Sequence, residues 1–456
     1  MSAADPAAMH RFGEEAERLA EAVRDYARGR LRLDPVPLDG PRAYAELAAD
    51  AGQTVTAKGL GWQEAMRVYA DVLAPATVSV DHPRYLAFIP SAPTEAATLF
   101  DLVVGASSIY GGSWLEGAGG VYAENQALRW LCDLAGLPDG AGGCFVSGGT
   151  SGNLAALVAA RHTFRAANPG AERLTVAATA ETHSSIASAA RVMDVELLSV
   201  PGDERGRMTG EALERAIAEQ EHAGLFAVAA TAGTTNSGVV DDLDGIAGVT
   251  RRRGLWLHVD GAYGAAALAA PSARGLFAGI EHADSLIVDP HKWLYSPFDC
   301  CALVYRSPEL ARAAHAQSAD YLEPMRVEGA WDPSDYAIHL SRRARGLPFW
   351  FSLAAHGSDA YTRAIEATLE VARAAAEEIR RRPELELLLE PDLSVLVFRR
   401  VGWGARDYSD WSMRLLADGV AFVMPTIFRG ETATRFAIVN PRTTLADLTA
   451  VLDTMA

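Results

Sequence analysis

Two lysines, Lys58 and Lys292, stand out among the 41 basic side chains of this chain, because the other 39 are arginine. Arginine stays protonated and cannot act as an amine nucleophile, whereas lysine can. Lys292 follows the apolar run 285–288, in the segment Asp289-Pro290-His291-Lys292-Trp293. Lys58 lies between Ala57 and Gly59 without such a context. The sequence therefore predicts that Lys292 is a reactive amine, the alternative being an ordinary surface lysine.

A carboxylate and a polar turn follow two further apolar runs. The run 255–259 ends in Asp260, and the run that ends at Thr231 leads into a turn that contains Thr235. Functional residues of open α/β folds collect at the carboxyl ends of parallel strands. We therefore expect Asp260 and Thr235 to lie near Lys292, although a helix cap or an ion pair would also explain an aspartate at this position.

Small residues from Ser147 to Asn153 precede a helical stretch. Free backbone N–H groups at such a helix start bind anions, and the hydroxyls of Thr150 and Ser151 add donors, although similar turns often just cap helices. A lysine for a Schiff base, an acid for a ring nitrogen and a phosphate cradle together indicate pyridoxal phosphate (PLP). Asp260 would keep the ring nitrogen protonated, which makes the ring an electron sink for a carbanion at the substrate's alpha carbon.

Two motifs are similar to those of a known family, the group II PLP-dependent decarboxylases, typified by aromatic L-amino acid decarboxylase and related to glutamate decarboxylase. The segment Asp289–Leu294 resembles the lysine signature of this family, and Leu257–Tyr263 resembles its acid motif. The resemblance runs from about His82 to the C-terminus. It implies fold type I of the PLP-dependent enzymes, an L-amino acid substrate, and release of an amine and carbon dioxide.

The resemblance also implies a role for each matching residue. Lys292 would form the Schiff base with the cofactor, Asp260 would pair with the ring nitrogen, and His183 would stack on the ring. Thr235 would lie near the ring hydroxyl, and Ala262 would pack under the ring. The residues implied around the phosphate are Thr150, Ser151, His291 and Asp289, the last at a position where some members carry asparagine.

The reaction type is implied by a stretch that resembles the family's mobile catalytic loop. It opens with Asp320-Tyr321-Leu322, and Tyr321 would return a proton to the alpha carbon after carbon dioxide leaves. Related enzymes that release an aldehyde tend to carry phenylalanine there. The tyrosine favours simple decarboxylation, and an oxidative decarboxylase-deaminase or aldehyde synthase on the same scaffold stays as the alternative.

Two stretches resemble those that line the family's substrate pocket. The residues that we predict to line it are Ser91, Tyr110, Gly112 and Trp114. Gly112 stands where related enzymes carry a ring, so we expect extra room there for a large side chain. Arg84 is the one basic residue in these stretches, so a second substrate carboxylate lacks an obvious partner. An aromatic substrate of the tryptophan, tyrosine, dopa or phenylalanine class is favoured, and a non-aromatic one stays open.

The elements that position these residues form more than one domain, because 456 residues exceed what one core usually fills, roughly 250 to 300. We predict a helical segment 1–80 for dimer packing, a large PLP-binding α/β domain 81–315, and a catalytic loop with a small α+β domain 316–456. The apolar runs predicted as strands are Leu174–Ala178, Leu225–Thr231, Leu255–Asp260, Ser285–Asp289, Ala302–Tyr305, Ser394–Arg399, Val420–Met424 and Arg435–Val439. Runs this apolar suit a mostly parallel sheet that is covered on both faces. The striped helix 12–31 offers a surface for a homodimer.

Composition excludes several classes of function. The net charge of −17 argues against nucleic acid, which attracts basic surfaces. A phosphate-binding Walker loop needs glycine before lysine, but Ala57 and His291 precede the two lysines. The absence of a long apolar run, of a C-x-x-C pair among the four cysteines and of a zinc motif predicts no membrane span, no metal and a reducing cytoplasm. A cofactor-free interaction protein on the same fold is the alternative to an enzyme.

Overall fold

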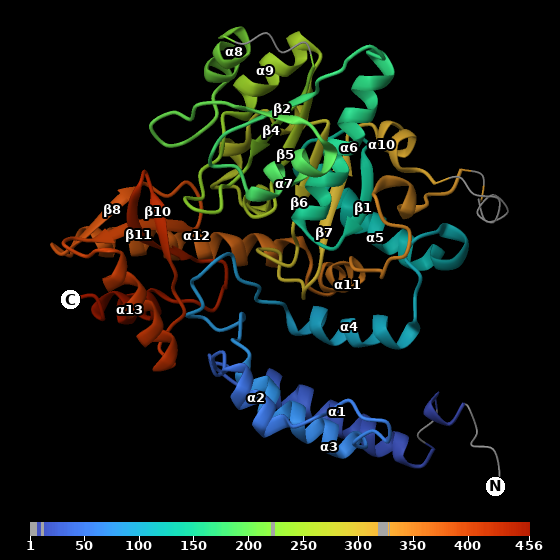
Figure 1. The fold of residues 1–456 in the computed structure, drawn as a ribbon, viewed down its shortest axis with the longest axis vertical. Coiled ribbons are helices and arrows are strands. Elements are labelled where there is room, and N and C mark those ends of the chain that lie inside the picture. Colours follow the sequence, from blue (N-terminus) through green and yellow to red (C-terminus); the bar gives the residue numbers. More distant parts are fainter. Residues whose placement is uncertain (1–6, 11–12, 220–223, 318–326, 328) are drawn as a thin grey trace.

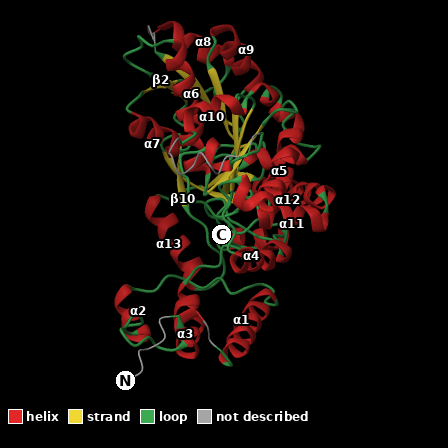
Figure 2. Ribbon diagram, turned by 90° about the vertical axis from the view of Figure 1, so that its right-hand side faces the viewer, coloured by secondary structure: helices red, strands yellow, loops and turns green. Residues whose placement is uncertain are grey.

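The computed structural model describes residues 7–10, 13–219, 224–317, 327 and 329–456 (Figure 1). Tyr321 lies outside the described residues. The chain begins with three helices that project from one end of the molecule (Figures 1 and 2). They are α1 (Glu15–Leu31), α2 (Tyr44–Ala51) and α3 (Trp62–Val68). No residue of α1 is fully buried, so its apolar stripe is only partly covered by the described part of the chain.

A seven-stranded sheet forms the centre of the molecule. Its strands, in spatial order, are β1 (Gly142–Val146), β7 (Cys301–Tyr305), β6 (Ser285–Val288), β5 (Trp256–Asp260), β4 (Leu225–Thr231), β2 (Thr175–Ala178) and β3 (Glu196–Ser199). Strands β6, β5, β4, β2 and β3 run parallel to one another, and β7 is antiparallel to both of its neighbours. The expected mostly parallel α/β sheet is confirmed.

Helices cover both faces of this sheet, which explains why its strands are so apolar. Every residue of β4 is buried, and Val228 and Ala230 pack into one core while Ala227 and Ala229 pack into the other. The helices around the sheet are α4 (Glu95–Ser107), α5 (Trp114–Leu134), α6 (Gly149–Ala167), α7 (Ser184–Met193), α8 (Gly210–Glu219), α9 (Leu243–Arg253), α10 (Pro308–His315), α11 (Leu347–His356) and α12 (Ser358–Arg380). Helix α6 begins just after the end of β1 and packs across strands β4, β5, β6 and β7.

A smaller antiparallel sheet follows α12. Its order is β10 (Pro425–Phe428), β11 (Glu431–Ala437), β9 (Val395–Arg400) and β8 (Leu385–Leu389). Helices α13 (Ala405–Ala417) and α14 (Leu445–Asp453) complete this unit. The domain boundaries at residues 80 and 315 stay predictions.

One predicted strand is wrong. The run Val420–Met424 is a connection, and the strand begins after it, at Pro425. The run is apolar because Ala421 and Val423 are fully buried. Its backbone pairs with a distant segment, since Phe422 O accepts from Leu86 N at 2.8 Å and Phe422 N donates to Arg84 O at 3.0 Å. The run 420–424 therefore looks like a strand in the sequence because it is buried, although it is not part of the small sheet.

None of the helices in the described part of the chain combines the length and the apolar composition that crossing a membrane requires.

Candidate active site

A cavity of about 290 Å³ opens where β4, β5 and β6 end and α6 begins. It brings together most of the residues that the sequence singled out. Those that line it are Thr150, His183, Thr235, Asp260, Ala262, Asp289, His291 and Lys292. The adjacent parallel strands β4, β5 and β6 supply Thr231, Asp260 and the segment that holds Lys292. The prediction that these side chains share one edge of the sheet agrees with this arrangement.

Lys292 is partly exposed and forms an ion pair with the buried carboxylate of Asp289. Its Nζ is 3.0 Å from Asp289 Oδ2, and His291 Nε2 lies 3.6 Å from the same oxygen. Burial alone would lower the pKa of Lys292, but the carboxylates of Asp289 and Asp260 outweigh burial and raise it. Burial opposes ionisation of Asp289 as well, yet Lys292 and His291 lower the pKa of that carboxyl. Asp289 therefore fixes both the charge and the position of the lysine amine.

Asp260, only 5% exposed, receives two hydrogen bonds. Asn153 Nδ2 donates to its Oδ2 at 2.8 Å, and the backbone N–H of Ala262 donates to its Oδ1 at 3.1 Å. His183 is held nearby, because its Nδ1 lies 2.8 Å from Ser185 Oγ and caps the start of α7. The acid and the imidazole are thus both immobilised by neighbours.

The residues present fit PLP. Thr231 Oγ1 and Asp289 Oδ1 are buried polar atoms without a hydrogen-bond partner among the described residues, and both belong to residues that line the cavity. The first turn of α6 leaves backbone N–H groups for a phosphate. A Cβ on Gly149 would lie 3.2 Å from Asp289 Oδ2 and 3.3 Å from Ala262 Cβ, so the cradle needs glycine there. The cavity therefore combines an anion-binding helix start with two polar atoms that are free to bind a cofactor, next to the amine of Lys292.

Of the predicted residues that the structure describes, five are not among those that line this cavity. Ser151 Oγ lies 3.0 Å from Ser147 Oγ, and Ser147 does line it. Ser91 Oγ donates to Ser296 O at 3.1 Å, which places it just behind the lysine segment. Tyr110 donates to Leu340 O at 3.0 Å, and the backbone N–H of Trp114 donates to Asp332 Oδ1 at 2.7 Å.

The interpretation of Gly112, the fifth of these residues, as extra room for a substrate side chain stays a prediction. A Cβ at this position would lie 2.4 Å from the ring of Tyr110. In this structure the Tyr110 ring therefore occupies the space next to Gly112.

Sequence reasoning missed several residues at the site. Asn153, Tyr263, Phe298 and Asp299 also line the cavity. Asn153 was visible only as part of a turn rich in small residues.

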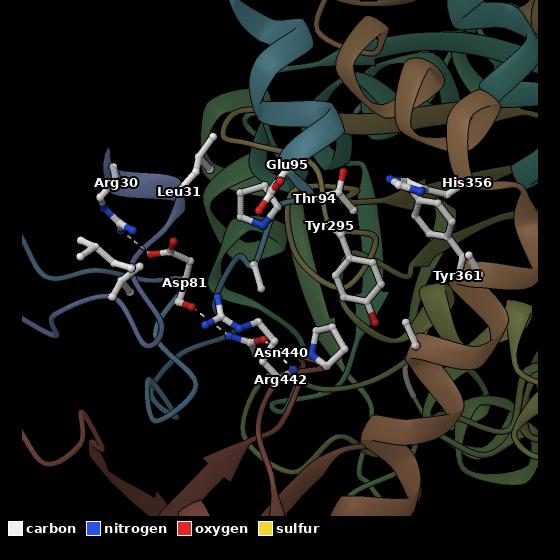
Figure 3. Close-up of a pocket in the computed structure, with 17 residues that line it drawn as sticks. Arg30, Leu31, Asp81, Thr94, Glu95, Tyr295, His356, Tyr361, Asn440 and Arg442 are labelled. Atoms are coloured by element: carbon white, nitrogen blue, oxygen red, sulfur yellow. Dashed lines mark hydrogen bonds and ion pairs between the residues drawn. The ribbon is translucent and has the colours of Figure 1, made fainter. Parts of the chain in front are cut away.

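A second cavity, of about 340 Å³, lies where the end of α1, the start of α4 and the loop after β11 meet (Figure 3). Arg30 and Asp81 form an ion pair on one side at 2.8 Å. Tyr295 and Tyr361 stand on the other side with ring centroids 5.9 Å apart (Figure 3). None of the residues predicted for catalysis lines this cavity.

Comparison with known proteins agrees with this geometry. The family model described as the pyridoxal-dependent decarboxylase conserved domain matches residues 46–401. The aromatic-L-amino-acid decarboxylase of Bacillus atrophaeus is 30% identical over 387 residues, which cover 82% of this chain and 80% of that protein. The L-2,4-diaminobutyrate decarboxylase of Rhizobium meliloti (strain 1021) is 31% identical over 387 residues, covering 82% and 77%.

The fold is shared with solved structures. The crystal structure of Oryza sativa TDC with PLP and tryptamine matches with a TM-score of 0.87 at 23% identity, covering 100% of this chain and 99% of that one. From the family model, the relatives and the fold, the chain belongs to the pyridoxal-dependent decarboxylase family and is a PLP-dependent amino acid decarboxylase.

Proposed function

We propose that the chain converts an aromatic or bulky apolar L-amino acid to its amine and carbon dioxide, with Lys292 as the residue that binds PLP covalently. The composition of the cavity carries this proposal. Lys292 is the only lysine or arginine among the described residues that line it, so a substrate side chain with a second carboxylate finds no cation there. Phe298 is 54% exposed and lies against His291 with ring centroids 4.8 Å apart, which offers an aromatic surface.

Bound PLP supplies the electron withdrawal that lets the alpha carbon lose its carboxylate. Lys292 provides the amine, and Asp289 holds Nζ in place and balances its charge. Asp260 would accept a hydrogen bond from the protonated ring nitrogen and so keep that nitrogen cationic. Thr150 and His291 would hold the phosphate at the start of α6, where the helix dipole adds a partial positive charge. Ser151, which the family resemblance also implies, would act next to Ser147.

His183 and Tyr321 complete the proposed machinery. His183 would pack on the ring, held by Ser185. Tyr321 would return a proton to the alpha carbon, a role that rests on the family resemblance. Tyr321→Phe should therefore lower amine formation and produce aldehyde with hydrogen peroxide. Unchanged amine formation by this variant would remove Tyr321 from the mechanism.

A basic side chain is the second candidate substrate, because a carboxylate also lines the cavity. Asp299 is 44% exposed and could attract an ammonium group, as a diaminobutyrate side chain presents. Its Oδ1 lies 2.9 Å from Arg345 Nε, however, so its charge is already paired. This pairing is why we favour an apolar substrate.

A substrate panel tests the proposal. L-tryptophan, L-tyrosine, L-dopa, L-phenylalanine, L-glutamate, L-histidine and L-2,4-diaminobutyrate would be incubated separately with the PLP-loaded enzyme, and amine, aldehyde, carbon dioxide and hydrogen peroxide quantified. We expect the highest kcat/KM with an aromatic substrate and equal amounts of amine and carbon dioxide. A preference for a basic substrate, or aldehyde as the main product, would overturn it. Lys292→Ala should bind no PLP that borohydride fixes to the chain.

We also propose a homodimer that covers α1 and α4. An apolar pocket of about 630 Å³ lies between these two helices, and the residues that line it include Leu19, Leu31, Leu99 and Leu102. Leu99 and Leu102 are 51% and 63% exposed, and exposed apolar surface of this kind marks an interaction site. Closed two-fold dimers are the commonest soluble assemblies. Light scattering should give twice the chain mass of 48.5 kDa, and a monomer at micromolar concentration would contradict the proposal.

Residence in the cytoplasm is proposed from the cysteines. Cys132, Cys144, Cys300 and Cys301 are all free and buried, as expected for thiols in a reducing compartment. Cell fractionation with an antibody to the chain would test this.

A further inference from the structure

A chain of buried hydrogen bonds connects the interior of β5 to Asp260. Trp256 Nε1 donates to Ser285 Oγ at 2.8 Å, and this oxygen lies 2.9 Å from His258 Nδ1. His258 Nε2 lies 2.8 Å from Asn153 Oδ1, and Asn153 Nδ2 donates to Asp260 Oδ2 at 2.8 Å. All five residues are at most 7% exposed. Water therefore competes little for these contacts.

The two ends of this series of hydrogen bonds, Trp256 and Asp260, determine where every proton in it lies. A carboxylate oxygen only accepts, so the Asn153 amide must present its N–H to Asp260 and its oxygen to His258. That oxygen only accepts, so His258 must carry its proton on Nε2. An indole N–H only donates, so Ser285 accepts from Trp256 and donates its own proton to His258 Nδ1. One arrangement satisfies all four contacts.

His258 is in the charge state that this arrangement needs. Burial lowers its pKa to about 4, although the negative charge of Asp260 opposes this shift. The imidazole is thus neutral at physiological pH, with one N–H donor and one acceptor. A protonated His258 would have two donors and would lose the hydrogen bond from Ser285.

The same amide reaches the other side of the cavity. Asn153 Nδ2 also donates to Ser185 Oγ at 2.8 Å, and Ser185 Oγ lies 2.8 Å from His183 Nδ1. Because Ser185 accepts from the amide, its hydroxyl proton goes to His183, whose Nδ1 also accepts from the Ser185 backbone N–H at 3.2 Å. The proton of the His183 ring is then left to Nε2.

We infer that Asn153 and His258 are positioning residues for the cofactor: neutral His258 fixes the orientation of the Asn153 amide, and that amide orients both Asp260 and His183. Neither residue belongs to the reacting groups. The inference goes beyond the choice of substrate, and it rests on the proposed pairing of Asp260 with the ring nitrogen of PLP. Its consequence is that cofactor affinity and ring orientation depend on a histidine that the cofactor does not need to touch.

The test measures PLP binding rather than turnover. Apoprotein would be titrated with PLP, with the dissociation constant taken from absorbance and the ring orientation from visible circular dichroism. The variants are Asn153→Leu and His258→Leu, which remove the amide or the Nε2–H donor, and His258→Gln, whose amide nitrogen can replace that donor. Tyr305→Phe is the matched control, because it removes a buried hydrogen bond, from Tyr305 to Tyr336 O, in the same sheet without touching Asp260.

We expect Asn153→Leu and His258→Leu to weaken PLP binding by about ten- to hundredfold, the effect of losing a hydrogen bond to a charged group, and to alter the dichroism. His258→Gln should recover most of the affinity, and Tyr305→Phe should match the unmodified protein. Equal losses in His258→Leu and His258→Gln, or in the control, would overturn the inference, because packing alone would then explain them.

Two further variants keep the outcome decisive. If His258→Leu does not fold, Ser285→Ala leaves the ring in place and removes its Nδ1 partner, together with the acceptor of Trp256 Nε1. A smaller shift in the same direction is then expected, and no shift contradicts the inference. Asp260→Asn separates the two levels of the argument. Unchanged PLP binding in Asp260→Asn would refute the proposed role of Asp260 itself. Weakened PLP binding in Asp260→Asn, together with normal PLP binding in Asn153→Leu, would refute only the positioning role of Asn153.

Discussion

A buried carboxyl group in α5 provides a quantitative test of the electrostatics behind the site. Glu124 is 4% exposed, and its Oε1 accepts from the backbone N–H of Gly346 at 2.7 Å, where α11 begins. Burial raises the pKa of Glu124 from 4.5 to about 7, although the Gly346 N–H, Arg342 and Arg345 oppose the shift. Arg345 also pairs with Asp299 in the cavity wall. The charge of Glu124 is therefore linked to an element next to the site.

The magnitude follows from proton linkage. Between pH 4.5 and 7 the folded chain keeps a proton on Glu124 that the unfolded chain has released, so the free energy of unfolding falls as the pH rises through this window. At about 1.4 kcal/mol per pKa unit, the loss amounts to about 3 kcal/mol by pH 7 and then levels off. Glu124→Gln is neutral at every pH and can still accept from Gly346, so it should avoid this loss.

Urea unfolding followed by tryptophan fluorescence measures the difference between Glu124→Gln and the unmodified chain from pH 5 to 8.5. The change of this difference with pH is the result of interest, because any packing effect of the amide is constant. The variant should gain about 3 kcal/mol on the unmodified chain between the two ends of the range. Glu116→Gln, on the same helix but exposed, corrects for removing one negative charge. A difference that stays constant with pH would show that Glu124 is ionised throughout and paired with Arg342, and would refute the reasoning.

Three glycines give further predictions. Gly152→Ala places a Cβ 2.8 Å from Ile287 Cγ2 and pushes α6 off the sheet, so we expect a stability loss of about 1–3 kcal/mol and weaker PLP binding. Gly248→Ala, in mid-helix with only the flexible Arg252 side chain at 3.4 Å, should instead gain about 0.5–1 kcal/mol, and an equal loss in both variants would contradict the packing argument. Gly112→Ala should lower the melting temperature because its Cβ meets the Tyr110 ring, and adding Tyr110→Leu should restore much of it; no recovery in the double variant would mean that the clash lies elsewhere.

The fold was predictable from the sequence where burial is uniform. Strand β4 is buried along its whole length, and its apolar run predicted Leu225–Thr231 with the observed bounds. Strand β3 was missed because it lies at the edge of the sheet and Leu198 is its one buried residue. The run Val420–Met424 failed for the opposite reason, since it is buried without being a strand of the small sheet. Apolar patterning reports burial, and it reports strands only where burial and sheet pairing coincide.

The site was predictable where a residue follows a strand. Asp260 and Lys292 come after apolar runs, so their neighbourhood followed from the parallel sheet alone. His258 has no such signal, because it lies inside the apolar run of β5. It meets Ser285 only because the register of β5 and β6 pairs these two residues. It meets Asn153 only because α6 crosses behind β5. Contacts of this kind depend on register and helix placement, which the pattern of one sequence does not specify.

The distribution of charge in the cavity explains why the site suits a cationic ring. Three carboxylates line it, at Asp260, Asp289 and Asp299. Asp289 pairs with Lys292 and Asp299 pairs with Arg345, whereas Asp260 has hydrogen-bond donors but no ion-pair partner in the part of the chain that is described. A buried charge without a counterion is costly. On the proposed pairing, a protonated ring nitrogen at Asp260 would remove that cost. The site that Asn153 and Ala262 hold in place would then bind the protonated form of PLP better than the neutral form, and it is the protonated form that withdraws electrons from the alpha carbon.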